Sequence, residues 1–66
     1  MQLNPQVNEF YRHKKRGTCY LILGLATMQC ELGTMDMLTV VVYQDSTGKQ
    51  WVRPFEEFTS ERFEKV

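Results

Sequence analysis

The sequence is poor in the residues that most often build metal sites and covalent cross-links. It contains one histidine and two cysteines, Cys19 and Cys30, which do not form a Cys-x-x-Cys pair. A zinc site of the usual kind needs more ligands than these. We therefore expect no metal and no cofactor. The methionine-rich stretch at residues 28–37 offers soft ligands for Cu(I), but apolar gap filling is the commoner use of methionine.

The sequence also lacks an excess of either charge, a long apolar run and a secretory signal. Eight basic residues balance eight acidic ones, so the chain as a whole is not an electrostatic binder of nucleic acid or membranes. The longest apolar stretch, residues 20–26, is far shorter than the about 20 residues of a membrane-spanning helix. Residues 1–5 lack the basic and apolar pattern of a signal peptide. We expect a cytoplasmic protein with free thiols and no membrane contact.

A chain of 66 residues is long enough for one domain. We expect residues 1–8 to form a flexible N-terminal arm and residues 9–66 to form a single domain. A domain of this size buries only about 60% of the surface of its unfolded chain, so its core is marginal without support such as self-association. The basic N-terminal part and the glutamate-rich C-terminal part can attract each other across the domain. The aromatic residues expected in the core are Phe55, Phe58 and Phe63.

Short segments rich in β-formers predict a mainly β domain. The candidate strands are residues 9–13, 18–29, 38–43, 50–53 and 62–66. Turn signals at residues 14–17 and 45–48 join strands, and residues 55–58 are expected to form one short 3-10 turn. Gly24, inside the second strand, is typical of a bulge or bend. Antiparallel strands with one helical turn before the last indicate a small SH3-like barrel of about five strands.

Two predicted strands, residues 20–26 and 38–43, are apolar on both faces. Alternation puts Tyr20 and Ile22 on one face of the first strand and its leucines on the other. One small sheet has only one core face to bury. Either a bent strand serves both walls of a coiled barrel, or the second face is buried in a homodimer.

No catalytic motif is present, and we expect no enzymatic activity. The sequence contains no phosphate-binding glycine loop and no nucleophile elbow. The single histidine, His13, is flanked by basic residues and is expected at the surface. Catalysis by His13 would need a nucleophile or a carboxylate held beside it.

Two clusters are typical of binding sites. Trp51 and Arg53 share one face of a strand, so the guanidinium can lie near the indole, with Glu56 or Glu57 as its ion-pair partner. The alternative is that Trp51 anchors the core and Arg53 makes a structural ion pair. The basic run at residues 11–16 suits phosphate groups, or it is a solvated turn. The candidate binding residues are Tyr11, Arg12, His13, Lys15, Trp51 and Arg53.

Four blocks of the sequence carry a family resemblance. They are Tyr11-Arg12-His13-x-Lys15, Tyr20-x-x-x-Gly24-x-Ala26, Val41-Val42-Tyr43-Gln44 and Trp51-Val52-Arg53-Pro54-x-Glu56-x-Phe58. Over about residues 10–63 the chain resembles the small bacterial and phage proteins grouped as domain of unknown function sixteen fifty-three. It departs from their pattern at residues 14–16 and 28–37. The resemblance implies a small β-barrel-like fold, a bacterial or prophage cytoplasmic setting and no established activity.

The sequence therefore favours a small non-enzymatic binding module, phage- or prophage-encoded, for an anionic or planar ligand or a host protein. Aromatic faces beside cationic donors suit a nucleotide, a nucleic-acid segment or an acidic peptide. Two alternatives stay open. One is a structural or protein-interaction homodimer without a small-molecule site, and the other is a nucleic-acid-binding β-barrel.

Overall fold

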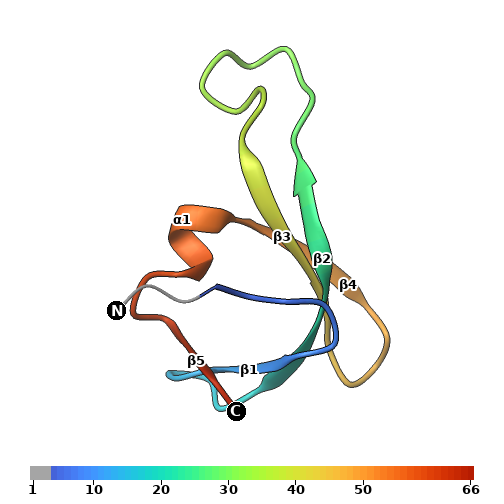
Figure 1. The fold of residues 1–66 in the computed structure, drawn as a ribbon, viewed down its shortest axis with the longest axis vertical. Coiled ribbons are helices and arrows are strands. Elements are labelled where there is room, and N and C mark those ends of the chain that lie inside the picture. Colours follow the sequence, from blue (N-terminus) through green and yellow to red (C-terminus); the bar gives the residue numbers. More distant parts are fainter. Residues whose placement is uncertain (1–3) are drawn as a thin grey trace.

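The computed structural model describes residues 4–66, which form five strands and one helical turn (Figure 1). In chain order the elements are β1 (Phe10–His13), β2 (Cys19–Thr27), β3 (Thr39–Gln44), β4 (Gln50–Pro54), α1 (Phe55–Phe58) and β5 (Phe63–Lys65). Each strand begins and ends within two residues of a predicted segment. The prediction of a mainly β fold with five antiparallel strands is therefore confirmed.

The five strands form one open sheet, so the predicted barrel is wrong. Their order is β4-β3-β2-β1-β5, and every neighbouring pair is antiparallel. β4 and β5 lie at opposite edges, and closure would require them to pair with each other. Instead, the chain turns out of β4 into α1, which is α-helical rather than the predicted 3-10 turn, and returns to pair β5 with β1. The likeness to SH3 domains is not confirmed.

A bulge at Gly24 divides the longest strand, β2, into two parts. The pairing of β2 with β3 shifts register between Ile22 and Gly24. A bulge bends its strand and increases the local twist. The first part of β2 pairs with β1, while β3 pairs with β2 from Leu21 to Thr27. The predicted bulge is confirmed, and it lets one strand serve two differently oriented parts of the sheet.

The hydrophobic core lies on one face of the sheet and consists mainly of aromatic rings. Its buried members are Tyr11, Tyr20, Ile22, Val41, Tyr43, Phe58 and Phe63. Phe58 of α1 stacks on Phe63 of β5 with ring centroids 4.1 Å apart. Phe55 packs against this cluster but is only partly buried. The helical turn therefore covers the core face and packs against the last strand. The prediction of core positions is confirmed for Phe58 and Phe63, whereas Phe55 lies at the margin of the core.

The other face of the sheet, which we call the outer face, is apolar and uncovered at several positions. Phe10 is 52% exposed and pairs with Leu21, and Val52 is 56% exposed and pairs with Val42. The bent strand therefore does not account for all of the apolar surface.

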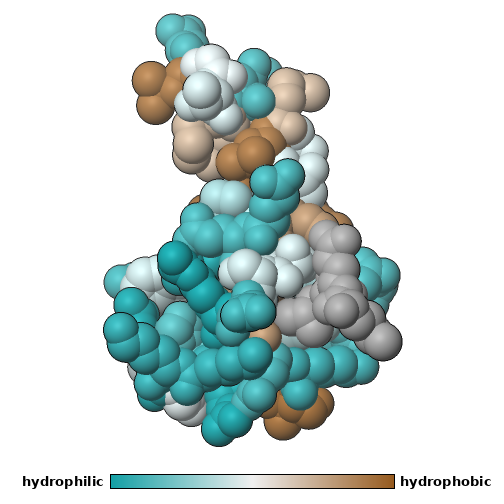
Figure 2. Space-filling view, turned by 90° about the vertical axis from the view of Figure 1, so that its left-hand side faces the viewer, coloured by the Kyte–Doolittle hydropathy of each residue, from teal (hydrophilic) through white to brown (hydrophobic). Residues whose placement is uncertain are grey.

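The chain leaves the body of the domain in the long loop between β2 and β3. This loop projects beyond the sheet in Figure 1, and Figure 2 shows apolar side chains gathered on it above a more hydrophilic body. Met37 is 71% exposed, and Met35 is exposed as well. The interpretation of these methionines as gap fillers is wrong, because the projecting loop has no core beneath it to fill.

The N-terminal arm is described only in part. Pro5 is buried, and the N–H of Asn8 donates a hydrogen bond to the carbonyl of Ile22 at 2.9 Å. Residues 1–3 lie outside the described residues, and the flexibility of the arm stays a prediction.

We expect Phe58→Ala to lower the free energy of unfolding by about 3–5 kcal/mol, because it removes a fully buried ring and leaves a cavity. Phe10→Ala is the matched control, since Phe10 is half exposed, and it should cost about 1 kcal/mol or less. Urea denaturation followed by circular dichroism measures both. Equal losses for the two variants would contradict the placement of the core.

Candidate functional site

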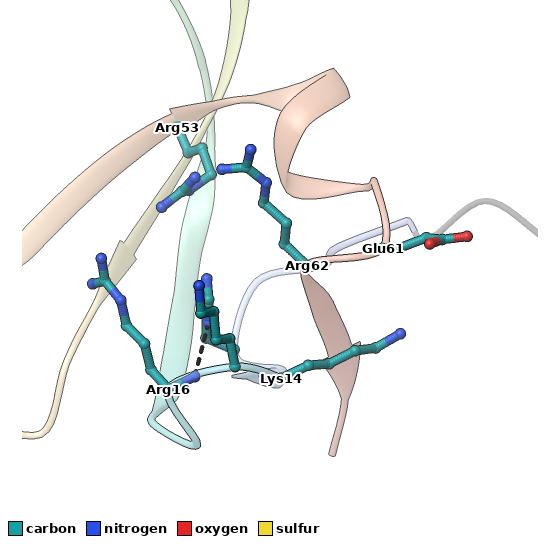
Figure 3. Close-up of a pocket in the computed structure, with 7 residues that line it drawn as sticks. Lys14, Arg16, Arg53, Glu61 and Arg62 are labelled. Atoms are coloured by element: carbon teal, nitrogen blue, oxygen red, sulfur yellow. Dashed lines mark hydrogen bonds between the residues drawn. The ribbon is translucent and has the colours of Figure 1, made fainter.

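An open cavity of about 590 Å³ lies between the β1–β2 turn, β4 and the segment that leads into β5. We call it the cationic cavity. Its lining residues are His13, Lys14, Lys15, Arg16, Arg53, Glu61 and Arg62. Five of them carry positive charge, and among the described residues Glu61 is the one carboxylate of the lining. In Figure 3 the side chains of Arg16, Arg53 and Arg62 surround a common space, whereas those of Lys14 and Glu61 extend away from it.

Pairing of the first strand with the last brings distant cations together. His13 lies opposite Phe63, and the N–H of Lys14 donates to the carbonyl of Arg62 at 2.9 Å. The basic turn is closed by a hydrogen bond from the N–H of Gly17 to the carbonyl of His13 at 2.7 Å. Gly17 has φ +74°, a left-handed conformation that glycine adopts without steric cost. The β1–β2 turn and the start of β5 therefore form adjoining walls of the cavity.

Arg53 of β4 is held from three sides. Its Nε donates to Tyr43 Oη at 3.3 Å, and its Nη1 donates to Glu57 Oε1 at 2.7 Å. Its guanidinium carbon lies 5.4 Å from the centroid of the Phe63 ring. The hydrogen bond to Tyr43 is the main cause that raises the pKa of Arg53. The side chain is therefore a permanently charged group in a fixed position.

One carboxylate of α1 holds two arginines at the cavity. Glu57 Oε1 accepts from Arg53 Nη1 and also lies 3.3 Å from Arg62 Nη1. This confirms the predicted pairing of Arg53 with Glu56 or Glu57. The guanidinium of Arg53, however, lies over Phe63 and not over the indole as predicted.

His13 is buried, so its predicted surface position is wrong. Only 9% of the residue is exposed, because β5 pairs alongside β1 and the Phe63 ring packs edge-on against the imidazole at 5.0 Å. The backbone N–H of Arg16 donates to His13 Nδ1 at 3.2 Å. The neutral ring therefore carries its hydrogen on Nε2. Burial, followed by the nearby cations Arg16, Arg53, Arg62 and Lys15, lowers the pKa of His13.

Trp51 lies on β4 two residues before Arg53, which lines the cavity, and it does not belong to the core. It pairs with Tyr43, and Arg53 pairs with Val41, so both side chains of β4 lie on the core face of the sheet. Trp51 is 41% exposed, and its Nε1–H donates to Asp45 Oδ2 at 3.0 Å. Hydrogen bonds from Thr47 and Trp51 lower the pKa of Asp45 to about 2. The core-anchor interpretation of Trp51 is therefore wrong, while its shared face with Arg53 is confirmed.

The other predicted binding residues lie in separate places. Tyr11 is in the core. Arg12 points away from the core face and forms an ion pair with Glu64 of β5. This pair joins the basic N-terminal part to the glutamate-rich C-terminal part, as the sequence predicted, while Lys65 of β5 pairs with Glu9 at 2.8 Å in the opposite sense. Of the six predicted residues, the structure brings His13, Lys15 and Arg53 together in the cavity.

Three important residues of the cavity were not predicted as site residues: Arg16, Glu57 and Arg62. Arg16 belongs to a basic run that was visible in the sequence. Arg62 and Glu57 reach the cavity through the pairing of β5 with β1 and through the single turn of α1. The alternating pattern at residues 62–66 was the one signal for Arg62, and it did not reveal which strand lies beside β5.

The fold and the cavity define a small, mainly β domain with a cavity lined mostly by cations and an exposed tryptophan on the same face of the sheet. The chain belongs to the family described as Protein of unknown function (DUF1653), whose model matches residues 9–65. The resemblance found in the sequence is thereby confirmed. Comparisons with curated proteins and with solved structures find no match.

Within residues 4–66, no helix has the length and apolar character needed to cross a membrane. The same residues contain no group of three or more histidine, cysteine, aspartate or glutamate side chains placed to hold a metal ion.

We expect His13 to titrate below pH 6.5 in the folded protein. Because its pKa is lower in the folded than in the unfolded chain, unfolding takes up a proton within this window. The contribution to stability is therefore complete above pH 6.5 and falls as the pH drops toward the folded pKa. His13 is the only histidine, so its imidazole NMR signals report the titration directly.

The effect of the neighbouring positive charge of Arg16 on the pKa of His13 is tested by substitution. Arg16→Gln removes a cation that disfavours the imidazolium and should raise the pKa of His13. Arg12→Gln is the control, since Arg12 pairs with Glu64 and should leave the midpoint unchanged. A wild-type midpoint at or above pH 6.5 would contradict the described surroundings of His13.

Proposed function

We propose that this protein is a non-enzymatic binding module that takes an anionic ligand in the cationic cavity. The observation that supports this function is that five positively charged residues line about 590 Å³ of open space, and that the side chains of Arg16, Arg53 and Arg62 surround it. Counted over the lining residues and Glu57, five positive charges stand against two carboxylates, an excess of three positive charges. Holding like charges together is unfavourable, and a bound anion relieves that repulsion.

A binding role fits the chemistry of the lining better than a catalytic one. Nδ1 of His13 already accepts a backbone hydrogen bond, so the neutral ring offers an N–H donor to the cavity rather than a free base. The other lining side chains are lysines, arginines and one glutamate. The ligand class includes a small phosphorylated or carboxylated molecule and an acidic segment of a host protein. We place this activity in the cytoplasm of a bacterium or a phage-infected cell.

Titration with pyrophosphate and with citrate, followed by amide NMR, tests the proposal. We expect saturable shifts in the signals of residues 13–17 and 62, weaker at high salt. Arg16→Gln should weaken binding on the order of tenfold, the equivalent of one lost charge-assisted hydrogen bond. Arg12→Gln, outside the cavity, should bind as the wild type does. If neither anion binds, or if both variants lose affinity equally, the proposed site is wrong.

A second candidate function is self-association through the outer face. Val52 and Phe10 leave more than half of their surface exposed, and both lie on the face opposite the core. A second copy would bury this apolar surface and support a marginal core. The cationic cavity opens on the other face, so a homodimer of this kind leaves it accessible.

We expect wild-type protein to form a dimer at high concentration and Val52→Lys to shift it to the monomer, because a charge would then face the apolar partner surface. Multi-angle light scattering measures the mass. Leu32→Lys is the control, since Leu32 is exposed on the β2–β3 loop away from the outer face. A wild-type protein that stays monomeric at millimolar concentration would remove the homodimer.

A further inference from the structure

We propose that the ligand of the cationic cavity is a nucleotide unit with a terminal phosphate, the phosphate lying among Arg16, Arg53 and Arg62 and the base lying against Trp51. This inference rests on the proposed function and names its ligand. The two parts of the ligand correspond to two features on the same face of the sheet. One is the cavity itself, and the other is the exposed indole of Trp51, two residues before the cavity-lining Arg53 on β4.

The arginines of the cavity favour a phosphate over a carboxylate. A carboxylate has two oxygens and one charge, which one guanidinium fork can satisfy. A phosphate monoester carries a charge of about −1.5 to −2 and three terminal oxygens, so it can engage several cations at once. The side chains of Arg16, Arg53 and Arg62 approach one space from three different elements of the chain. Tyr43 and Glu57 occupy some of the N–H groups of Arg53 and Arg62. The remaining N–H groups of three guanidinium groups around one space suit a phosphate better than a carboxylate.

Arg53 is prepared for such a ligand before it binds. Its contacts to Tyr43, Glu57 and Phe63 fix the guanidinium, so binding does not have to order it. His13 adds a second fixed donor, because the backbone of Arg16 occupies Nδ1 and leaves the hydrogen on Nε2. Fixed donors reduce the entropy lost when the ligand binds.

The distribution of charge favours a terminal phosphate over an extended nucleic-acid backbone. A protein that follows a backbone needs a groove lined with basic residues along several phosphates. Here the cations gather in one cavity, and the net charge of the chain is zero. The segment from α1 to β5 that borders the cavity carries Glu56, Glu57, Glu61 and Glu64. A single phosphate group fits this confined charge.

The exposed ring of Trp51 is the reason for proposing that the ligand contains a nucleobase. Trp51 precedes Arg53 by two residues on the same face of β4, so their Cα atoms are about 7 Å apart. The indole is exposed and is fixed by its hydrogen bond to Asp45. Lys49 Nζ lies over one face of the ring, 4.4 Å from its centroid, so a base has to stack on the other face. Exposed aromatic rings stack readily on nucleobases. Inorganic phosphate or pyrophosphate would make no use of this fixed ring.

The experiment uses the single tryptophan as its probe. The wild-type chain is titrated with pyrophosphate, ribose 5-phosphate, the four ribonucleoside 5′-monophosphates and a short single-stranded oligonucleotide with or without a 5′-phosphate. Binding is followed by Trp51 fluorescence and by amide NMR. We expect at least one nucleoside monophosphate to bind about tenfold or more tightly than ribose 5-phosphate, with a change in fluorescence, which is the range of one base–aromatic stack.

Two variants distinguish the contribution of the phosphate to the binding affinity from the contribution of the base. Trp51→Leu should reduce the affinity for that nucleotide to the affinity for ribose 5-phosphate and leave pyrophosphate binding unchanged. Arg16→Gln should weaken pyrophosphate and nucleotide alike. Circular dichroism verifies that both variants are folded. The fluorescence titration of the wild-type chain tests the base contact without any substitution.

The outcomes distinguish the inference from the function on which it rests. Equal binding of nucleotides and ribose 5-phosphate would overturn the base contact and leave an anion site. Equal binding of oligonucleotides with and without a 5′-phosphate would overturn the terminal phosphate. If the phosphorylated oligonucleotide binds more tightly than free nucleotides, the inference is supported and the ligand is the phosphorylated end of a nucleic acid. If free nucleotides bind more tightly, the inference is supported and the ligand is a free nucleotide. Failure of every anion would overturn the proposed function itself.

Discussion

The ring of Phe63 joins the hydrophobic core to the cationic cavity. It stacks on Phe58 at 4.1 Å, lies nearly perpendicular to the ring of His13 at 5.0 Å and lies 5.4 Å from the guanidinium carbon of Arg53. β5 has only three residues, and Phe63 is the buried one among them. The same ring therefore completes the core and supports two of the groups that line the cavity. Folding of the C-terminal segment and formation of the site are, for this reason, one event.

A chain with no net charge can still concentrate cations, because its charges are unevenly distributed and Glu9 and Glu64 are paired away from the cavity. Glu64 pairs with Arg12, and Glu9 pairs with Lys65, both across the β1–β5 pair. These ion pairs leave the basic turn at residues 14–17 to face the cavity. Glu57 compensates two arginines without filling the space between them. The balance of charge over the whole sequence thus excludes a uniformly basic surface, but it says nothing about a local site.

The sequence allowed the strands to be predicted because their signals are local. The β-branched run in β3, the glycine in β2 and the proline at the end of β4 act within a few residues of themselves. The core phenylalanines could be predicted for a similar reason, since a short C-terminal segment has few other apolar groups to bury. The position of His13 could not be predicted in this way. It is buried by β5, a partner some fifty residues away, and no local pattern shows that pairing.

The open edge of the sheet explains both the wrong barrel and the site that the sequence did not reveal. Arg53 lies on β4 and Arg62 just before β5, at opposite ends of the strand order. In a closed barrel these two strands would hydrogen-bond to each other and leave no space between them. Here α1 spans the distance instead, and its Glu57 reaches an arginine on each side. The cationic cavity therefore occupies the place where closure would have been, and the single helical turn that prevents closure also positions the cations.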